Sequence, residues 1–522
     1  MSRNVYSIVG RFSLMSPMLV ALIAVFATVA SPTAAAGQDA RLGDVDFANS
    51  GAPEAQEAFE RGLLLLHSFE YGPASESFRE AQAADADFAM AYWGEAMTYN
   101  HPVWMRQDRE AALEALGRLA PTAAERERLA GPEGGGTERE AAWMRAVDVL
   151  YGEGEKEDRD RAYADAMAAL HAAHPDDPDA AAFHALALLG TAHEGRDFAT
   201  YMVSAGILEQ VVDAHPGHPG IAHYLIHSYD DPIHAPLGIR AARAYSGIAP
   251  DAPHAQHMTS HIFVALGMWD DVVEANENSI RVMNEDRAAS GQPPSACGHY
   301  NFWLEYGYLQ QGRTSDALRL VRECYELVLN AAGGDAPDPD RSPVGSYAQM
   351  LARYVVDAGG EAAAEPLGWP IDLVSAPDAR LTMEFARGYA AAGRGDAVAL
   401  DAARVGLAEA AAAVEGSDSA GPSREGILAM ELDALHGSLG GDDGRAIDLA
   451  REAAAAEETL PIEFGPPHVD KPTHELLGEL LLKAGRADEA HAAFRDALAR
   501  SPERAQALAG LSAAERELKA GR

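Results

Sequence analysis

The recurrence of two histidine pairs limits the fold of this chain more than any other feature. His223 and His227 are followed, 34 residues later, by His257 and His261. A period of 34 residues is typical of a helix-turn-helix repeat, in which each unit returns the chain to an equivalent place on the next layer. We therefore expect the two pairs on adjacent, parallel helices. Within each pair, the spacing of four residues directs both imidazoles from one helix face.

The segment 473–502 carries the same kind of repeat in more detail. Small residues let two helices approach closely, apolar residues fill the space between them, a glycine makes the turn and a proline ends the unit. The small residues are Gly478, Ala490 and Ala497, and the apolar residues are Leu477, Leu481 and Phe494. Gly485 is the turn glycine, and Pro502 ends the unit. The pattern resembles the tetratricopeptide repeat (TPR) superfamily, and related patterns occur at 62–81, 304–324, 386–393 and 434–446. The resemblance implies an all-α fold, a TPR-type α-solenoid forming a right-handed superhelix.

Composition agrees with a helical protein and restricts its partners. The chain has 48% hydrophobic residues but only 7% aromatic residues, which favours Ala-rich helices over a β-rich fold. Its formal net charge of −39 opposes binding to nucleic acid or to anionic lipid and favours cations and basic partners. A solvated acidic surface that keeps an exported protein soluble explains the charge equally well.

The first residues have the three parts of a secretory signal. Arg3 and Arg11 precede an apolar stretch at 18–30, and Ala34 and Ala36 supply a small-residue cleavage site. We expect residues 1–36 to be removed and the mature protein to be periplasmic or secreted, without stable membrane insertion. The alternative is an uncleaved N-terminal anchor.

Composition shifts divide the rest of the chain. We expect a linker at 37–54, an N-terminal TPR array with a His-rich groove at 55–332, a second linker at 333–345 and a C-terminal TPR array at 346–522. The linker at 333–345 is rich in Gly, Pro and Asp, which is typical of a surface loop.

The two cysteines lie on neighbouring predicted helices of one hairpin. Cys297 falls just before the helix expected at 299–311, and Cys324 lies along the antiparallel helix expected at 314–329. A disulfide is therefore plausible in an oxidising compartment. Two free thiols are the alternative, and a third possibility is that Cys297, near His299, is a soft metal ligand.

The resemblance to TPR proteins implies where these histidines point. In that superfamily the first helix of each repeat lines the concave groove, with groove-facing side chains at the second, fifth and ninth places. Here those places correspond to His254, His257 and His261, with His223 and His227 contributed by the preceding repeat and His299 and Tyr306 by the next. The segments HYLIHSYDDPIHAP and HAQHMTSHIF also resemble an exported bacterial TPR group, which implies no particular activity.

Convergent imidazoles on one wall predict a metal site. We expect His223, His227, His257 and His261 as its core, with His254, His234 and Asp230 as further ligands or as partners that fix the tautomers. Neutral imidazole suits a divalent transition metal such as Zn, Cu or Fe. Glu95, Tyr224 and His254 are candidates for proton transfer, and Glu95 is expected to face the same groove. A metal-free hydrogen-bonded network, or recognition of an acidic peptide or small anion, would use the same histidines.

Standard catalytic motifs are missing from the sequence. His474-Glu475 lacks the second histidine of a zinc-protease motif, and no Gly-x-Ser-x-Gly, phosphate loop or Cys-x-x-Cys occurs. The first hypothesis is an exported TPR protein whose groove holds a transition metal, for metal handling or as a metal-dependent binding module. The second is a metalloenzyme with an open coordination position, and the third is a metal-free interaction scaffold. Each leaves room for a protein or peptide partner in the groove, and none involves nucleic acid.

Overall fold

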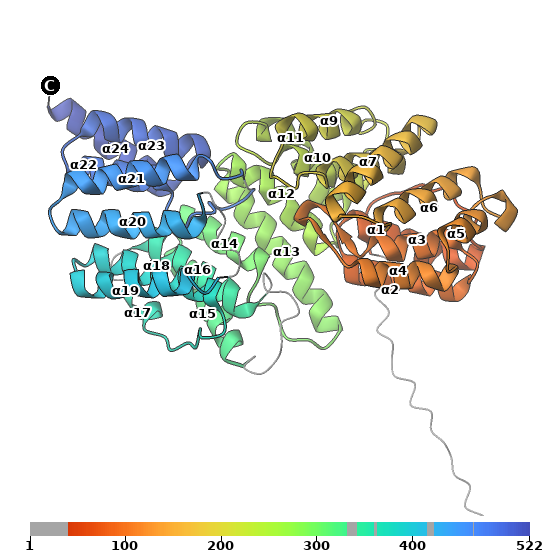
Figure 1. Ribbon diagram of the computed structural model, residues 1–522, viewed down its shortest axis with the longest axis horizontal. Coiled ribbons are helices and arrows are strands. Elements are labelled where there is room, and N and C mark those ends of the chain that lie inside the picture. Colours follow the sequence, from red (N-terminus) through yellow and green to blue (C-terminus); the bar gives the residue numbers. More distant parts are fainter. Residues whose placement is uncertain (1–39, 331–341, 360–362, 415–421, 463, 522) are drawn as a thin grey trace, which may run out of the picture. The chain divides into compact units, whose positions relative to one another are not determined.

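The computed structural model describes residues 40–330, 342–359, 363–414, 422–462 and 464–521. These residues belong to one compact unit. The predicted signal peptide at 1–36 lies outside the described residues, and so does most of the predicted linker at 333–345. Most of the helices are labelled in Figure 1.

The N-terminal part consists of helices with one small antiparallel ladder of two strands, β1 and β2, in which Asn100 pairs with Gln107. Its elements are α1 (Pro53–His67), α2 (Tyr71–Ala84), α3 (Ala89–Met97), β1 (Asn100–His101), η1 (Pro102–Trp104), β2 (Arg106–Gln107), α4 (Arg109–Leu119), α5 (Ala123–Ala130), η2 (Pro132–Gly134), α6 (Glu138–Leu150), α7 (Lys156–Ala173), α8 (Pro178–Leu189) and α9 (Phe198–Glu209).

The central part carries the histidine pairs. Its helices are α10 (Pro219–Tyr229), α11 (Ala235–Ile248), α12 (Pro253–Ala265), α13 (Trp269–Ala289), α14 (His299–Gln310) and α15 (Thr314–Asn330). The C-terminal part consists of α16 (Pro343–Ala358), α17 (Ala364–Leu367), α18 (Pro377–Gly393), α19 (Ala397–Ala411), α20 (Arg424–Leu439), α21 (Asp443–Glu457), α22 (Thr473–Lys483), α23 (Ala487–Arg500) and α24 (Ala505–Ala520). Neighbouring helices pack as hairpins, as α20 and α21 do in Figure 1.

Glycine and phenylalanine repeat one packing device at both ends of this helical array. A Cβ added at Gly478 or at Gly510 would lie within 3 Å of the Phe494 ring, so this ring fits only between two glycines on α22 and α24. Residues 62, 78 and 94, on α1, α2 and α3, show the same Gly-Phe-Gly arrangement with the same spacing. Such close helix approach needs residues without a Cβ, and its recurrence marks the repeat. The predicted turn residues Gly267 and Gly485 also adopt the left-handed backbone, with φ of 67° and 72°.

The predicted all-α, TPR-type α-solenoid is confirmed. Ala and Leu, which dominate the composition, fill the seams between hairpins because small side chains let helices pack closely. None of the helices in the described ranges is long and apolar enough to cross a membrane.

The two cysteines form a disulfide, which joins Cys297, two residues before α14, to Cys324 in the middle of α15. Of the alternatives that the sequence left open for these cysteines, the structure shows the disulfide. Cys297 as a metal ligand is excluded in this state, because its sulfur is bonded to that of Cys324.

The segment 40–52, expected to be a linker, packs against the helices that follow it. Phe47 is buried and stacks on Trp93, with ring centroids 5.7 Å apart, while the Arg139 guanidinium lies 4.1 Å from the centroid of its ring. The backbone of Asp44 also donates a hydrogen bond to the carbonyl of Gly217, at 2.9 Å. This stretch of chain without helix is therefore part of the core.

C-terminal residues also reach the central helices. Trp269 Nε1 donates to the carbonyl oxygen of Glu503 at 2.9 Å, and the ring of Phe464 lies 4.8 Å from that of His261. The segment between α21 and α22 thus closes over α12, which positions it as a cover for the histidines described next.

Candidate metal centre

Three first helices of consecutive hairpins, α10, α12 and α14, carry the histidines. Pro219 and Pro253 each occupy the first turn of their helix, where the missing N–H costs nothing. Because α10 and α12 then run in register, their pairs at four-residue spacing project from equivalent faces, as the 34-residue period predicts. Every residue of α10 is buried, so these rings lie inside the protein.

The structure divides the rings into two groups of three. His223, His227 and His254 form the first triad, in which one ring nitrogen from each lies within 4.8 Å of the others. His257, His261 and His299 form the second triad by the same criterion. Each triad thus holds two of the four residues predicted as one core and gains a histidine from the start of the next first helix. His227 and His261 also form a group with the predicted ligand Asp230 by the same criterion, and this group joins the two triads.

The first triad presents three nitrogen atoms that lack a partner. The Nε2 atoms of His223, His227 and His254 are buried and accept or donate no hydrogen bond among the described residues. Buried polar atoms are normally hydrogen-bonded, and leaving one unpaired costs about 1–3 kcal/mol. Three such atoms in one small volume are therefore expected to have a ligand.

Hydrogen bonds at the opposite ring nitrogens fix which atom faces inward. His223 Nδ1 donates to the carbonyl oxygen of His67 at 2.7 Å, and His261 Nδ1 donates to Asp230 Oδ2 at 3.0 Å. Because a carbonyl and a carboxylate only accept, both rings carry their proton on Nδ1 and a lone pair on Nε2.

Asn276 on α13 has the same effect on His257. Its Oδ1 lies 2.7 Å from His257 Nδ1, and its Nδ2 donates to the carbonyl oxygen of Val272 at 2.8 Å. The second bond fixes the orientation of the amide, so that an oxygen faces His257 and must accept. His257 therefore also presents a lone pair on Nε2.

The Nε2 atoms of His257 and His261 consequently face each other as two acceptors. They lie 3.3 Å apart, and neither can donate because both ring protons are held at Nδ1. Two nitrogens bound to one ion at roughly 2.0–2.1 Å with a tetrahedral angle are about 3.3–3.4 Å apart. The separation matches that of two ligands of one cation, and a cation would remove the repulsion between the lone pairs.

Burial keeps these rings neutral. It lowers the pKa of His223, His254 and His257 well below the ordinary value, and neighbouring imidazoles lower it further. Burial also lowers the pKa of His261, although Asp230 acts in the opposite direction. Neutral imidazole is the form that binds a metal, so no proton has to leave these four rings near neutral pH.

Asp230 lies between the triads as a charged acceptor. Burial alone would raise its pKa, but the Arg196 guanidinium and hydrogen bonds from His227 and His261 hold it well below the usual range. Arg196 Nη1 donates to Asp230 Oδ1 at 2.6 Å, and His227 Nδ1 lies 3.5 Å from Asp230 Oδ2. One ring of each triad is therefore oriented by the same carboxylate, as expected for a metal site.

Aromatic rings cover the histidines. The Phe69 ring lies 4.3 Å from that of His223, and the Trp303 ring stacks on that of His261 at 4.5 Å. The core histidines are at most 2% exposed and His254 is 7% exposed, so they lie beneath a lid of rings and do not line an open groove. His299 is the exposed member.

The remaining predicted residues lie elsewhere. His234 bonds Asp231 through Nδ1 at 2.9 Å and belongs to neither triad. Glu95 on α3 accepts from Arg79 at 2.7 Å and pairs with Arg118, so its carboxylate balances two surface arginines and does not join the histidines. Tyr306 contacts Arg504 and Trp269.

Another buried group, which the sequence did not predict, lies next to the first triad. Asp179 Oδ1 is 2.8 Å from His67 Nε2 and 3.3 Å from His218 Nε2, and all three side chains are buried. His67 Nδ1 lies 3.1 Å from the hydroxyl of Tyr224. No spacing signal links residues so far apart, because the contact between α1, α8 and α10 exists only after folding.

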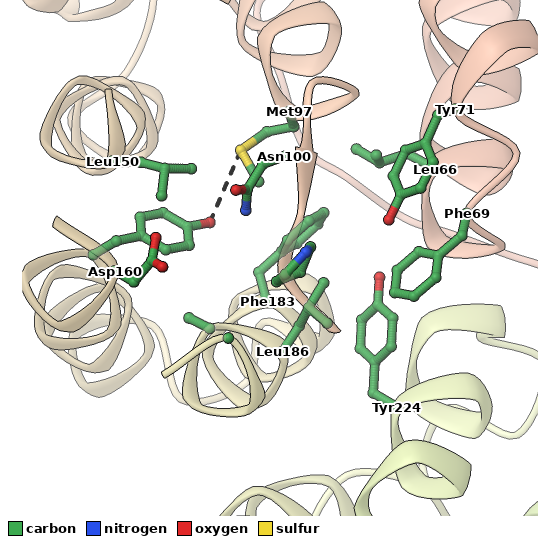
Figure 2. A pocket seen from close by; sticks show the side chains of 14 residues that line it. Leu66, Phe69, Tyr71, Met97, Asn100, Leu150, Asp160, Phe183, Leu186 and Tyr224 are labelled. Carbon is green, nitrogen blue, oxygen red and sulfur yellow. Dashed lines mark hydrogen bonds between the residues drawn. The ribbon is translucent and has the colours of Figure 1, made fainter. Parts of the chain in front are cut away.

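A narrow pocket with a volume of about 20 Å³ borders this region (Figure 2). In Figure 2 the rings of Phe69, Tyr71 and Tyr224 converge on one side of it, and Leu150 and Asp160 lie on the other. Most of its other lining is apolar. Phe69, which also contacts His223, belongs to both the pocket wall and the cover of the first triad.

Comparisons with known proteins give a likeness in fold alone. No protein-family model matches the chain, and no curated protein matches it. Among solved structures, yeast Tom70 is 12% identical, with 90% of this chain and 96% of that chain covered and a TM-score of 0.34. The P58(IPK) TPR domain is 14% identical over 90% and 99%, with a TM-score of 0.22. The human IFIT1 dimer with PPP-AAAA is 12% identical over 88% and 99%, with a TM-score of 0.37.

Proposed function

We propose that this protein binds a transition metal ion in a buried, all-histidine site inside a helical-repeat scaffold. His223, His227 and His254 hold the ion through Nε2. The observation that carries the proposal is that these three buried nitrogens lack any hydrogen-bond partner in the described part of the chain.

The chemistry of the donor atoms limits which metal ions the site can bind. Three imidazole nitrogen donors without a thiolate favour Zn, Cu or Fe(II) over hard cations such as Ca and Mg, which prefer oxygen. Partners at Nδ1 increase the basicity of the ligand nitrogens and hold the rings in place. Here the His67 carbonyl accepts a hydrogen bond from His223, and Asp230 lies beside His227.

We also propose that the protein works outside the cytoplasm. The signal-like residues 1–36 and the disulfide between Cys297 and Cys324 both fit an oxidising compartment. The role there is the handling of a metal, or binding of a partner in a metal-dependent way.

Metal content tests the main proposal. The mature chain is purified from its native compartment, and its metals are quantified beside those of His223→Ala/His227→Ala. The matched control is His436→Ala, which removes a half-exposed histidine that pairs with Asp401 on a different helix. We expect stoichiometric metal in the wild type and the control and little in the double variant. Equal metal in all three would refute the proposal.

A metalloenzyme is the second candidate. Three protein ligands leave a coordination position for water or substrate. A small cavity of about 30 Å³, with room for little more than a water molecule, is lined by Asp230 and Phe464, which flank His261. Co(II)-loaded protein tests this idea: a change of its visible spectrum on adding azide indicates an open position, whereas an unchanged spectrum indicates a closed carrier site.

The predicted partner peptide has its own candidate place. A hollow of about 280 Å³ lies between the α10–α11 turn, the segment before α22, and helix α23, and prolines line much of it. Gly465, the residue after the cover residue Phe464, lines this hollow, so a bound segment would lie close to the cover of the metal site. Crosslinking of a photoreactive residue at Ile233, which is exposed at this hollow, tests for such a partner.

A further inference from the structure

We propose that the site is dinuclear, with a second ion held by His257, His261 and His299 beside the first. This inference rests on the proposed function and extends it from one ion to two. The second triad meets the same spatial criterion as the first, with one ring nitrogen from each residue within 4.8 Å of the others.

The two triads are one ligand set repeated along the solenoid. In each, a first helix supplies two rings four residues apart, and the start of the next first helix supplies the third. Thus α10 and α12 build the first triad, while α12 and α14 build the second. Histidines at the fifth and ninth places of one repeat therefore combine with one at the second place of the next. Each further repeat with histidines at these places would add one triad.

A glycine at the start of α10 prevents a further triad on the N-terminal side. The second place of the α10 repeat is Gly220, where a Cβ would lie 2.2 Å from His67 Nδ1. A histidine there would collide with the His67–Asp179–His218 group, which packs against the start of α10. No further triad of this kind therefore precedes α10 among the described helices.

The second triad has its own evidence for a cation. His257 Nε2 and His261 Nε2 face each other at 3.3 Å with both ring protons held at Nδ1. This contact is unfavourable between two lone pairs and favourable around a shared cation. His299 approaches the same place, with its ring centroid 4.6 Å from that of His257.

Contacts between the triads place the two ions close together. The ring centroids of His227 and His261 are 5.6 Å apart, and those of His254 and His257 are 6.1 Å apart. Asp230 contacts a ring of each triad. Its negative charge lowers the repulsion between two cations held this near to each other.

Stoichiometry distinguishes two sites from one. The metal-free mature chain is titrated with Co(II) under anaerobic conditions, and bound ions are counted by elemental analysis and by visible absorption. We expect two ions in the wild type, one in His299→Ala and one in His254→Ala. The double variant His254→Ala/His299→Ala should bind none tightly, and His436→Ala should bind two.

Folding controls accompany the variants. Because His299 is exposed, His299→Ala should leave the helical circular dichroism unchanged. His254 is buried, so His254→Gln serves as a second variant that keeps a polar group of similar size and lacks the imidazole.

The other outcomes overturn the proposal in different ways. One ion in the wild type, lost in both single variants, would mean one site built from both triads and would leave the proposed function standing. Two ions retained in His299→Ala would place the second ion elsewhere. No ion in the wild type would refute both the proposed function and this inference.

Cu(II) supplies a second readout. Two Cu(II) ions in neighbouring triads are close enough for magnetic interaction, so the wild type should show a half-field electron paramagnetic resonance signal. His299→Ala should lose this signal and keep the spectrum of one isolated ion. Two isolated-ion spectra in the wild type would contradict the pairing.

Discussion

Replacing Asn276 tests whether the tautomer of His257 determines metal binding. Asn276 is fully buried on α13, accepts from His257 Nδ1 and does not belong to either triad. The variant Asn276→Leu keeps the branched shape of the side chain but removes the acceptor. His257 Nδ1–H is then buried without a partner, or the proton moves to Nε2 and blocks the ligand atom.

The magnitudes follow from these contacts. An unsatisfied buried donor costs about 1–3 kcal/mol, so the metal-free variant should be less stable by that amount. Loss of a partner that orients a metal ligand typically costs about 10–100-fold in affinity, or roughly 1.4–2.8 kcal/mol. Only the triad of His257, His261 and His299 should weaken, because His223 takes its tautomer from the carbonyl of His67.

Competition against a chromogenic chelator measures both dissociation constants, and urea denaturation of the metal-free chain measures stability. Asn276→Asp is the matched control, because its carboxylate still accepts from His257 and should preserve affinity. Equal binding of both ions by Asn276→Leu and the wild type would refute the argument. If the variant bound both ions more weakly by the same factor, the triads would not be separate sites.

Three further predictions concern the scaffold. Gly478→Ala should lower stability by about 1–3 kcal/mol in urea denaturation, because its Cβ would overlap the Phe494 ring; unchanged stability would contradict the Gly-Phe-Gly packing. Cys297→Ala should cost about 2–4 kcal/mol, and the reductant that destabilises the wild type should then have no further effect on this variant. Burial lowers the pKa of His184 to about 4, so below pH 6.5 the unfolded chain gains a proton there that the folded chain does not. The stability of the metal-free protein should therefore fall between pH 6.5 and 4. His184→Phe should make this loss of stability smaller when urea midpoints at pH 7 and pH 5 are compared. An equal loss in the variant and the wild type would show that His184 does not contribute.

The sequence alone predicted the repeat, because its signals are local. Small residues at Gly478, turn residues such as Gly485 and a fixed period follow directly from the geometry of a helical hairpin. The same period put His223, His227, His257 and His261 on matching faces of neighbouring helices. Local spacing also placed Cys297 and Cys324 on one hairpin, where a disulfide could form, but it did not decide between a disulfide and free thiols.

Contacts between distant segments could not be predicted in this way. Burial of the rings depends on Phe69, Trp303 and Phe464, which come from three separate parts of the chain. The pairing of Glu95 with Arg79 and Arg118 likewise follows from how α2, α3 and α4 pack, and it removed Glu95 from the histidine site.

The sequence by itself thus determined the all-α repeat and the helix faces that carry imidazoles, because a period of 34 residues and a spacing of four residues fix direction along a helix. Only the tertiary structure decided that these rings form two triads with lone pairs directed inward. That outcome depends on the His67 carbonyl, Asn276 and Asp230, whose acceptor atoms fix the ring protons across distances in sequence that no local pattern spans.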